Sequence, residues 1–176
     1  LSLSATMNLP HEGYVVSGES LILDISFTVP PLAAGGVYQS PTVTITLPPG
    51  VTVNPDDVVS SVVQSRTLNQ GAAGYQYLVL GLNTSLEAGK GYQIQVPVQT
   101  NNFELEDSME EGDIPLTFPI EFQASYMDNE GKNQNLEISV SASTRVQASD
   151  GWRVEKAVET NNGQTVIDRV AEDGVE

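Results

Sequence analysis

Apolar and polar residues alternate along several segments of this chain, most clearly over residues 21–29. Every second position of that segment is apolar: Leu21, Leu23, Ile25, Phe27 and Val29. Because side chains of a β-strand point to opposite faces with a period of two, these residues share one face. The same alternation returns over residues 43–47, 92–98 and 114–122. The pattern predicts half-buried antiparallel strands.

Proline and glycine separate the predicted strands. Proline pairs stand at 30–31 and 48–49, and proline cannot donate a hydrogen bond to a central ladder. We therefore expect the first strand to begin near Leu21, after an N-terminal lead over residues 1–18. Further strands are expected over residues 41–47, 51–53, 75–82, 92–100, 114–127 (with bends at Pro115 and Pro119) and 136–146.

Residues 56–68 fit two interpretations. Val58, Val59, Val62 and Val63 match one face of a helix, which Asp56 or Asp57 would cap. Valine's branched Cβ favours a strand instead. We prefer the strand.

The C-terminal part contains two turn signals. Residues 128–132 predict a hairpin, with Gly131 suited to a positive φ. Beyond a boundary near 148–151, Trp152 opens a fresh strand-like segment, and Asn-Asn-Gly at 161–163 is a second hairpin signal. About eight or nine strands at a spacing of about 10–15 residues, with no long helix, predict a β-sandwich. We assign residues 1–148 to that sandwich and 149–176 to a linker and the start of a following, incomplete β module.

Composition narrows the classes of function. The 176 residues carry a net charge of −16, which argues against nucleic acid and anionic membrane surfaces as partners. There is no cysteine, so disulfides, thiol catalysis and cysteine-based zinc sites are excluded. No stretch approaches the roughly 20 apolar residues that span a membrane, so we expect no membrane insertion in this segment. The chain begins without Met, and we expect it to be a piece of a longer protein.

Three turn motifs follow one another along the chain: Leu-Pro-Pro-Gly-Val at 47–51, Leu-Glu-Ala-Gly-Lys at 86–90 and Tyr-Met-Asp-Asn-Glu-Gly at 126–131. In this order they resemble the corners of immunoglobulin-like modules in the stalks of bacterial, especially Gram-positive, surface proteins and adhesins. The resemblance covers most of residues 15–148. It implies an all-β fold, an immunoglobulin-like antiparallel β-sandwich with Greek-key connections over residues 1–148.

The resemblance also implies a role. It indicates a non-catalytic structural or adhesive module of an extracellular bacterial protein, anchored to the cell surface or cell wall through flanking regions. Its implied partners are other domains of the same protein and a host protein or glycan. The alternative is a carbohydrate- or protein-binding module, such as an adhesin tip or a cohesin-like domain. A hydrolase is the least favoured of the three.

Acidic residues gather between two predicted strands. Calcium prefers six to eight oxygen ligands, and closely spaced carboxylates supply several of them. The EF-hand pattern does not match, so we prefer a solvated acidic loop and keep calcium binding as the alternative. The candidate calcium ligands are Glu104, Glu106, Asp107, Glu110, Glu111 and Asp113. We expect no other cofactor.

Aromatic side chains suggest a second kind of site, because rings can stack on the apolar faces of sugars. Alternation places Tyr92 and Tyr126 on core-facing sides. Tyr38 lies in a glycine-rich loop, so we expect it to be exposed and name it as the candidate ligand-binding residue.

Signatures of catalysis are scarce. His11, in the predicted lead, is the single histidine, and no phosphate loop, dinucleotide fingerprint, nucleophile elbow or zincin motif occurs. The resemblance raises a lysine-to-asparagine or lysine-to-aspartate crosslink. Lys90 and Lys132 lie in predicted turns, where exposure to water disfavours that reaction, and the partner of Lys156 would lie in a domain that this chain does not complete.

Overall fold

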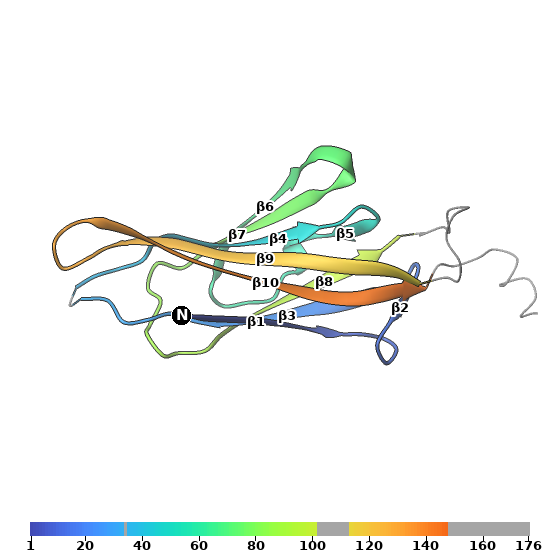
Figure 1. Ribbon diagram of the computed structural model, residues 1–176, viewed down its shortest axis with the longest axis horizontal. Helices are drawn as coiled ribbons and strands as arrows, with labels where there is room; N and C mark the ends of the chain where they lie inside the picture. The colour runs from blue at the N-terminus through green and yellow to red at the C-terminus, as the bar shows by residue number, and fades with distance from the viewer. Residues whose placement is uncertain (34, 102–112, 148–176) are drawn as a thin grey trace, which may run out of the picture.

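The computed structural model describes residues 1–33, 35–101 and 113–147, and the candidate acidic loop and residues 149–176 therefore lie outside the described part (Figure 1). Ten strands make up the described chain. They are β1 (Ser2–Asn8), β2 (Val15–Val16), β3 (Ser20–Thr28), β4 (Gln39–Leu47), β5 (Val51–Val53), β6 (Val63–Gln70), β7 (Gln76–Leu82), β8 (Tyr92–Thr100), β9 (Asp113–Met127) and β10 (Asn133–Gln147).

The strands form two sheets. One has the order β1-β3-β8-β5 and the other the order β2-β10-β9-β4-β7-β6. Neighbours are antiparallel except β2, which pairs with β10 in parallel over two residues. Figure 1 shows the long β9–β10 pair running along the body, with the β6–β7 hairpin projecting from it. The predicted all-β antiparallel sandwich is confirmed.

The strand order is that of an immunoglobulin domain with an insertion. In the constant type, the first, second, fifth and fourth strands form one sheet, and the third, sixth and seventh form the other. Here β1, β3, β8 and β5 take the first set of places, and β4, β9 and β10 take the second. Two strands, β6 and β7, are inserted between the fourth and fifth places and extend the second sheet past β4. The immunoglobulin-like class is confirmed, with β6 and β7 added to the seven-strand constant-type arrangement.

The core lies between the inward faces of the two sheets, as the alternation predicts. All five odd-numbered residues over 21–29 are buried, as are Leu78, Leu80 and Leu82 on β7. Side chains with no exposed surface come from both sheets: Val15, Leu23, Ile25, Val43, Ile45, Leu47, Leu78, Leu80, Ile94, Val96, Phe118, Phe122 and Val146.

The predicted N-terminal lead is wrong. Residues 2–8 form β1, which pairs with β3 from Ser2 opposite Thr28 to Asn8 opposite Ile22. Leu3, Ala5 and Met7 alternate with polar residues, but Ala5 and Met7 are only partly buried and carry little of the core. The pairing with β3 stabilises this edge strand where its own composition is weak.

The segment over 56–68 begins as a turn and ends as a strand. Asn54 Oδ1 accepts the Asp56 N–H at 3.1 Å and caps a single 3₁₀ turn over Pro55–Asp57. Neither Asp56 nor Asp57 is the cap. The preferred strand is confirmed from Val63 onward, as β6.

The predicted hairpin between β9 and β10 is confirmed. Gly131 has a φ of 78°. Asp128 Oδ1 accepts the backbone N–H of Lys132 at 2.9 Å and of Glu130 at 2.8 Å, and its Oδ2 accepts from Gln134 Nε2 at 2.9 Å. These hydrogen bonds, led by that from Lys132, lower the pKa of the Asp128 carboxyl. Asp128 is therefore a turn former, as expected.

Candidate functional site

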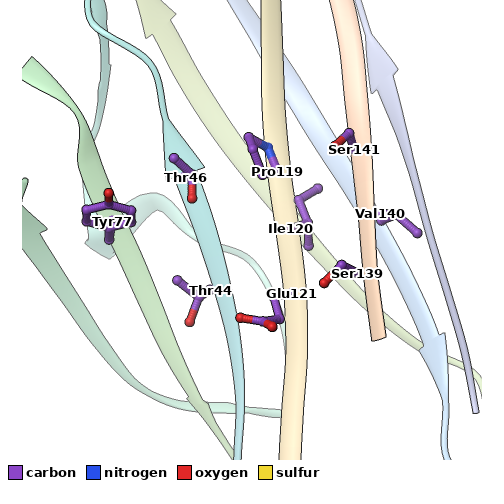
Figure 2. A pocket seen from close by; sticks show the side chains of 9 residues that line it. All are labelled: Thr44, Thr46, Tyr77, Pro119, Ile120, Glu121, Ser139, Val140 and Ser141. Atoms are coloured by element: carbon purple, nitrogen blue, oxygen red, sulfur yellow. The ribbon is translucent and has the colours of Figure 1, made fainter. Parts of the chain in front are cut away.

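A shallow groove lies on the outer face of the six-stranded sheet (Figure 2). Its volume is about 540 Å³, within the range of small-ligand sites. Strands β4, β7, β9 and β10 contribute its lining. The lining residues, here called the sheet groove, are Thr44, Thr46, Tyr77, Pro119, Ile120, Glu121, Ser139, Val140 and Ser141.

Pro119 explains where the groove forms. It stands in β9, a central strand, although proline cannot donate to a ladder. The pairing of β4 with β9 ends at Ile45 opposite Ile120, so it does not extend to Pro119, the next residue of β9 in that direction. In Figure 2 the two strands separate from that point toward Thr46. The proline that predicts a bend in the sequence therefore opens a gap in the face of the sheet.

Tyr77 forms one wall of the groove and is held by a glycine. The side chain is 37% exposed. It points outward because Leu78 and Leu80, at the alternate positions of β7, face the core. A Cβ at Gly71 would lie 2.5 Å from Tyr77 Cε2. The ring can therefore lie against the β6–β7 turn only because residue 71 has no side chain.

A row of polar side chains crosses the groove. Glu121 lies opposite Thr44 on β4 and opposite Ser139 on β10. Its carboxylate points toward Thr44, and within the described chain it accepts no hydrogen bond and makes no ion pair. Neighbouring pairs of the same β9–β10 ladder do satisfy each other.

Those satisfied pairs flank the groove on both sides. Thr117 Oγ1 lies 3.0 Å from Ser143 Oγ, and Gln123 Nε2 donates to Glu137 Oε2 at 3.4 Å. The polar groups that this ladder contributes to the groove thus remain available to a ligand.

A second depression continues along the same strands. Its volume is about 300 Å³, and its lining includes Gln39, Ser40, Thr42, Gln123, Ser125, Asn135 and Glu137. A register shift in β4 between Gln39 and Thr42 accompanies Ser40, whose φ is 49°. Left-handed backbone at a residue other than glycine is strained, and strain of this kind clusters at functional sites.

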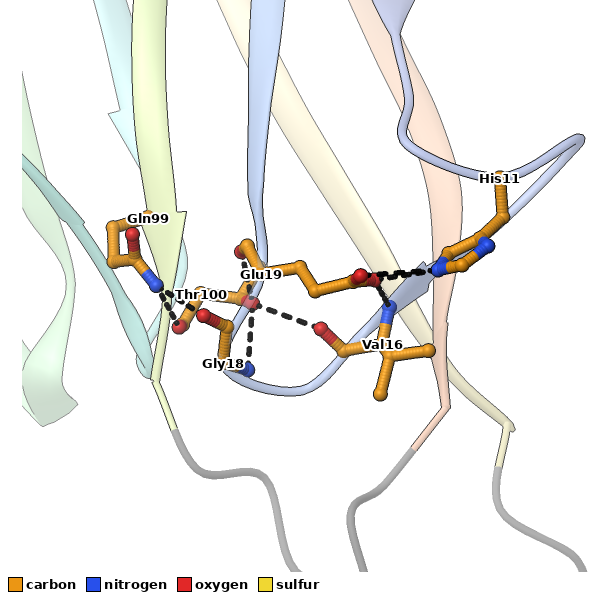
Figure 3. A network of polar contacts seen from close by, with 6 residues as sticks. All are labelled: His11, Val16, Gly18, Glu19, Gln99 and Thr100. Carbon is orange, nitrogen blue, oxygen red and sulfur yellow. Dashed lines mark hydrogen bonds and ion pairs between the residues drawn. The ribbon is translucent and has the colours of Figure 1, made fainter.

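A polar network holds one end of the sandwich (Figure 3). Thr100 is fully buried, and its Oγ1 donates to the Glu19 carbonyl at 2.6 Å and accepts from the Gly18 N–H at 3.1 Å. Glu19 Oε1 accepts the Val16 N–H at 2.8 Å and lies 2.8 Å from His11 Nε2. The network fixes the β2–β3 turn against the end of β8.

His11 belongs to this polar network at one end of the sandwich. Its ring stacks on Tyr14 with a centroid distance of 4.7 Å, and its Nε2 lies against the Glu19 carboxylate. Neither depression of the six-stranded sheet is lined by His11. His11 is therefore not among the residues that line the sheet groove.

The predicted calcium ligands cannot be placed. Glu104, Glu106, Asp107, Glu110 and Glu111 lie outside the described residues, and Asp113 begins β9 with its side chain outside the description. Within the described ranges no group of three histidines, cysteines or acids is close enough to hold a metal ion. Calcium binding by residues 104–113 stays a prediction.

The expectation that Tyr38 is exposed is wrong. Its side chain is 2% exposed, its ring meets Tyr126 edge-on at 6.1 Å, and its hydroxyl donates to the Pro30 carbonyl. The glycine-rich composition of the loop suggested exposure, whereas the loop folds back so that the ring enters the core. Tyr92 and Tyr126, expected in the core, are partly buried against it. Lys90 and Lys132 are exposed in turns, as expected.

Tyr38→Phe tests this buried position. We expect the free energy of unfolding to fall by about 0.5–1.5 kcal/mol at neutral pH, because the Pro30 carbonyl loses its donor. Burial, and secondarily Tyr126, raises the pKa of Tyr38 above its usual value near 10. The stability due to the neutral phenol is therefore present below pH 10 and lost as the pH rises through the raised pKa. Urea unfolding from pH 7 upward measures both effects, and an equal alkaline decline in the variant would contradict the assignment.

Sequence reasoning missed the sheet groove. The alternation of β7 placed Tyr77 opposite three leucines, and that contrast is the signal that Tyr77 faces outward. The approach of Tyr77 to Thr46 and Pro119 depends on the order of strands in the sheet, which the alternation does not encode.

Comparisons with known proteins identify the fold. No family model matches the chain, and no curated protein matches it. Among solved structures, a variant of BcpA, the major pilin subunit of Bacillus cereus, is similar with a TM-score of 0.50 and 11% identity, over 84% of this chain and 40% of that chain. The chain thus spans well under half of that pilin.

Two further structures are similar at lower scores. Domains D2 and D3 of the major pilin SpaD from Corynebacterium diphtheriae give a TM-score of 0.47 at 12% identity, over 72% of this chain and 47% of that chain. A non-cellulosomal cohesin from the archaeon Archaeoglobus fulgidus gives 0.42 at 13% identity, over 88% and 98%. Of these three structures, only the BcpA variant reaches a TM-score of 0.50, and this similarity shows the fold. The described residues contain no helix with the length and apolarity to cross a membrane.

Proposed function

We propose that this chain is a non-catalytic structural or adhesive module of a bacterial cell-surface protein. The observation that carries the proposal is the immunoglobulin-like sandwich shared with a Gram-positive pilin subunit. Its partners would be neighbouring domains of the same protein and a host protein or glycan. The module would hold these neighbours at a fixed distance from the cell.

The geometry of the terminal strands supports a load-bearing role. β1 pairs with β3 over seven residues, and β10 pairs with β9 over fifteen. Figure 1 shows β1 and β10 lying along the long axis of the body. A force between residue 1 and residue 147 therefore acts along these strands, so that many ladder hydrogen bonds must break together.

The β2 segment adds a clamp at the end of β10. The Ser17 N–H donates to the Gln147 carbonyl at 2.9 Å, and Ser17 Oγ donates to the Asn101 carbonyl at 2.8 Å. One residue thus holds the last residue of β10 and the residue that follows β8, which are strands of different sheets. We infer that this clamp keeps the end of the module rigid under load.

Stretching single molecules by their two chain ends tests the load-bearing role. We expect residues 2–147 to unfold in one cooperative event that lengthens the chain by roughly 500 Å, since each extended residue spans about 3.3–3.6 Å. Peeling of β1 or β10 in separate low-force steps would contradict a load-bearing role.

Antibodies against residues 1–147 test the surface location. They should label intact cells of the source organism, and labelling only after permeabilisation would contradict that location.

A further inference from the structure

We propose that the sheet groove binds a chain of neutral sugars, with Tyr77 as the stacking platform. The inference rests on the adhesive half of the proposed function and names the ligand class and the site. It is carried by three independent features: a fixed, half-exposed aromatic ring, a row of unsatisfied polar groups beside it, and the absence of cations from the lining.

The ring of Tyr77 offers an apolar face in a polar surface. Sugar rings carry C–H groups on one face, and these pack against an aromatic ring while the hydroxyls stay free to form hydrogen bonds. Tyr77 is 37% exposed, and contact with Gly71 restricts its ring before any ligand arrives. Little conformational entropy is lost on binding when a side chain is already fixed.

The polar row matches a ligand rich in hydroxyl groups. Glu121 accepts hydrogen bonds only, and the hydroxyls of Thr44 and Ser139 both donate and accept. None of these three groups has a hydrogen-bond partner among the described side chains. Sugar hydroxyls, as donors, would satisfy the Glu121 carboxylate with charge-assisted hydrogen bonds.

Charge favours a neutral sugar over an acidic one. Glu121 and Glu137 are the charged residues that line the two depressions. None of the described lysines or arginines lines either depression. The whole chain carries a net charge of −16, so a sulfated or uronic glycan would be repelled.

An extended peptide fits this surface less well. Peptides that bind sheets usually add a strand at an edge, where free backbone groups supply the affinity. The groove lies over β9, a central strand whose backbone pairs with β10 along its whole length and with β4 as far as Ile45 opposite Ile120. A peptide on this face would find no backbone ladder.

The length of the surface favours an oligosaccharide over a single sugar. From Pro119 to Ser125 the outward positions of β9 pass through both depressions. Six residues of strand span roughly 20 Å, at about 3.3 Å per residue. Several linked sugar rings would lie along that path.

Binding of neutral oligosaccharides tests the proposal. The complete chain is screened against linear gluco-, manno-, galacto- and chito-oligosaccharides, and the tightest probe is titrated by calorimetry. We expect Tyr77→Ala to weaken binding of that probe by at least about tenfold, through loss of the stacking surface. Glu121→Gln should weaken it as well, by about threefold to tenfold, because a neutral amide replaces the charged acceptor.

Tyr75→Ala is the matched control. Tyr75 is 41% exposed and stands two residues from Tyr77, but it does not line the groove. We expect its removal to leave the affinity unchanged. Gly71→Ala is a second probe of position, since its φ of −111° suits any residue while the new Cβ must displace the Tyr77 ring. It should weaken binding without unfolding the module.

Several outcomes would overturn the inference. They are the absence of binding to every neutral probe, equal losses in Tyr75→Ala and Tyr77→Ala, and a preference for sulfated glycans or for peptides. In an NMR titration with the same probe, changes in amide chemical shift confined to residues outside β4, β7, β9 and β10 would also contradict it. Absence of glycan binding together with cooperative unfolding under force would remove this inference and leave the structural module in place.

Discussion

Phe27→Ala is expected to lower the free energy of unfolding by about 3–5 kcal/mol. Phe27 is 1% exposed, and its ring lies 5.3 Å from that of Tyr92 and 5.2 Å from that of Phe122. The three rings come from β3, β8 and β9, so Phe27 joins the two sheets. Truncation loses the transfer free energy of the ring and leaves a cavity between rigid sheets that cannot close around it. Urea titration followed by circular dichroism measures the change.

Ile22→Ala is the control for Phe27→Ala. Ile22 lies on the same strand but on its outer face and is only partly buried. We expect its truncation to cost about 1 kcal/mol or less. Should Phe27→Ala fail to fold, Phe27→Leu fills most of the space and is expected to cost about 1–2 kcal/mol. Equal costs for Phe27→Ala and Ile22→Ala would show that the aromatic cluster is not the centre of the core.

The place of Phe27 was predictable from the sequence, because it depends on a local rule. Alternation with a period of two assigns each residue of β3 to a face before any partner is known. The same rule separated the leucines of β7 from Tyr77 on opposite faces, without showing which face is the core. Proline and glycine likewise marked the turns, since their effect on the backbone is intrinsic. The fold class followed from these local signals.

The sheet groove depends on contacts that alternation does not encode. Thr44 on β4 and Ser139 on β10 line the same groove only because β9 lies between their strands, with Glu121 opposite both. The fixed ring of Tyr77 depends on a missing Cβ across a hairpin. The predicted exposure of Tyr38 was wrong for the same reason. It was inferred from the composition of the loop, whereas the burial of Tyr38 depends on contacts with Tyr126 and with the Pro30 carbonyl.

Thr100→Val is expected to lower the free energy of unfolding by about 1–3 kcal/mol, although valine has nearly the same shape. Thr100 is fully buried, and its hydroxyl is the donor to the Glu19 carbonyl and the acceptor for the Gly18 N–H. Valine leaves the Gly18 N–H without this acceptor, whereas the Glu19 carbonyl keeps the backbone N–H of residue 100 as a donor at 3.0 Å. The stability is lost first in the turn before β3, because this hydroxyl helps to hold that turn to the end of β8 (Figure 3). Hydrogen exchange of the amides of residues 16–19 should therefore accelerate more than that of the core strands.

Thr100→Ser separates the hydroxyl from the shape of the side chain. Serine retains the donor and the acceptor and loses only a methyl group, so we expect it to keep slow exchange in the turn. Its cost should be that of one buried methyl group, about 1 kcal/mol. Valine and serine variants with equal exchange rates over residues 16–19 would contradict the role of the hydroxyl. If the valine variant alone loosens the turn, the Thr100 hydroxyl is needed, beside the backbone hydrogen bond from Thr100 to Glu19, to couple the entrance of β3 to the end of β8. A module loaded through its ends requires such coupling.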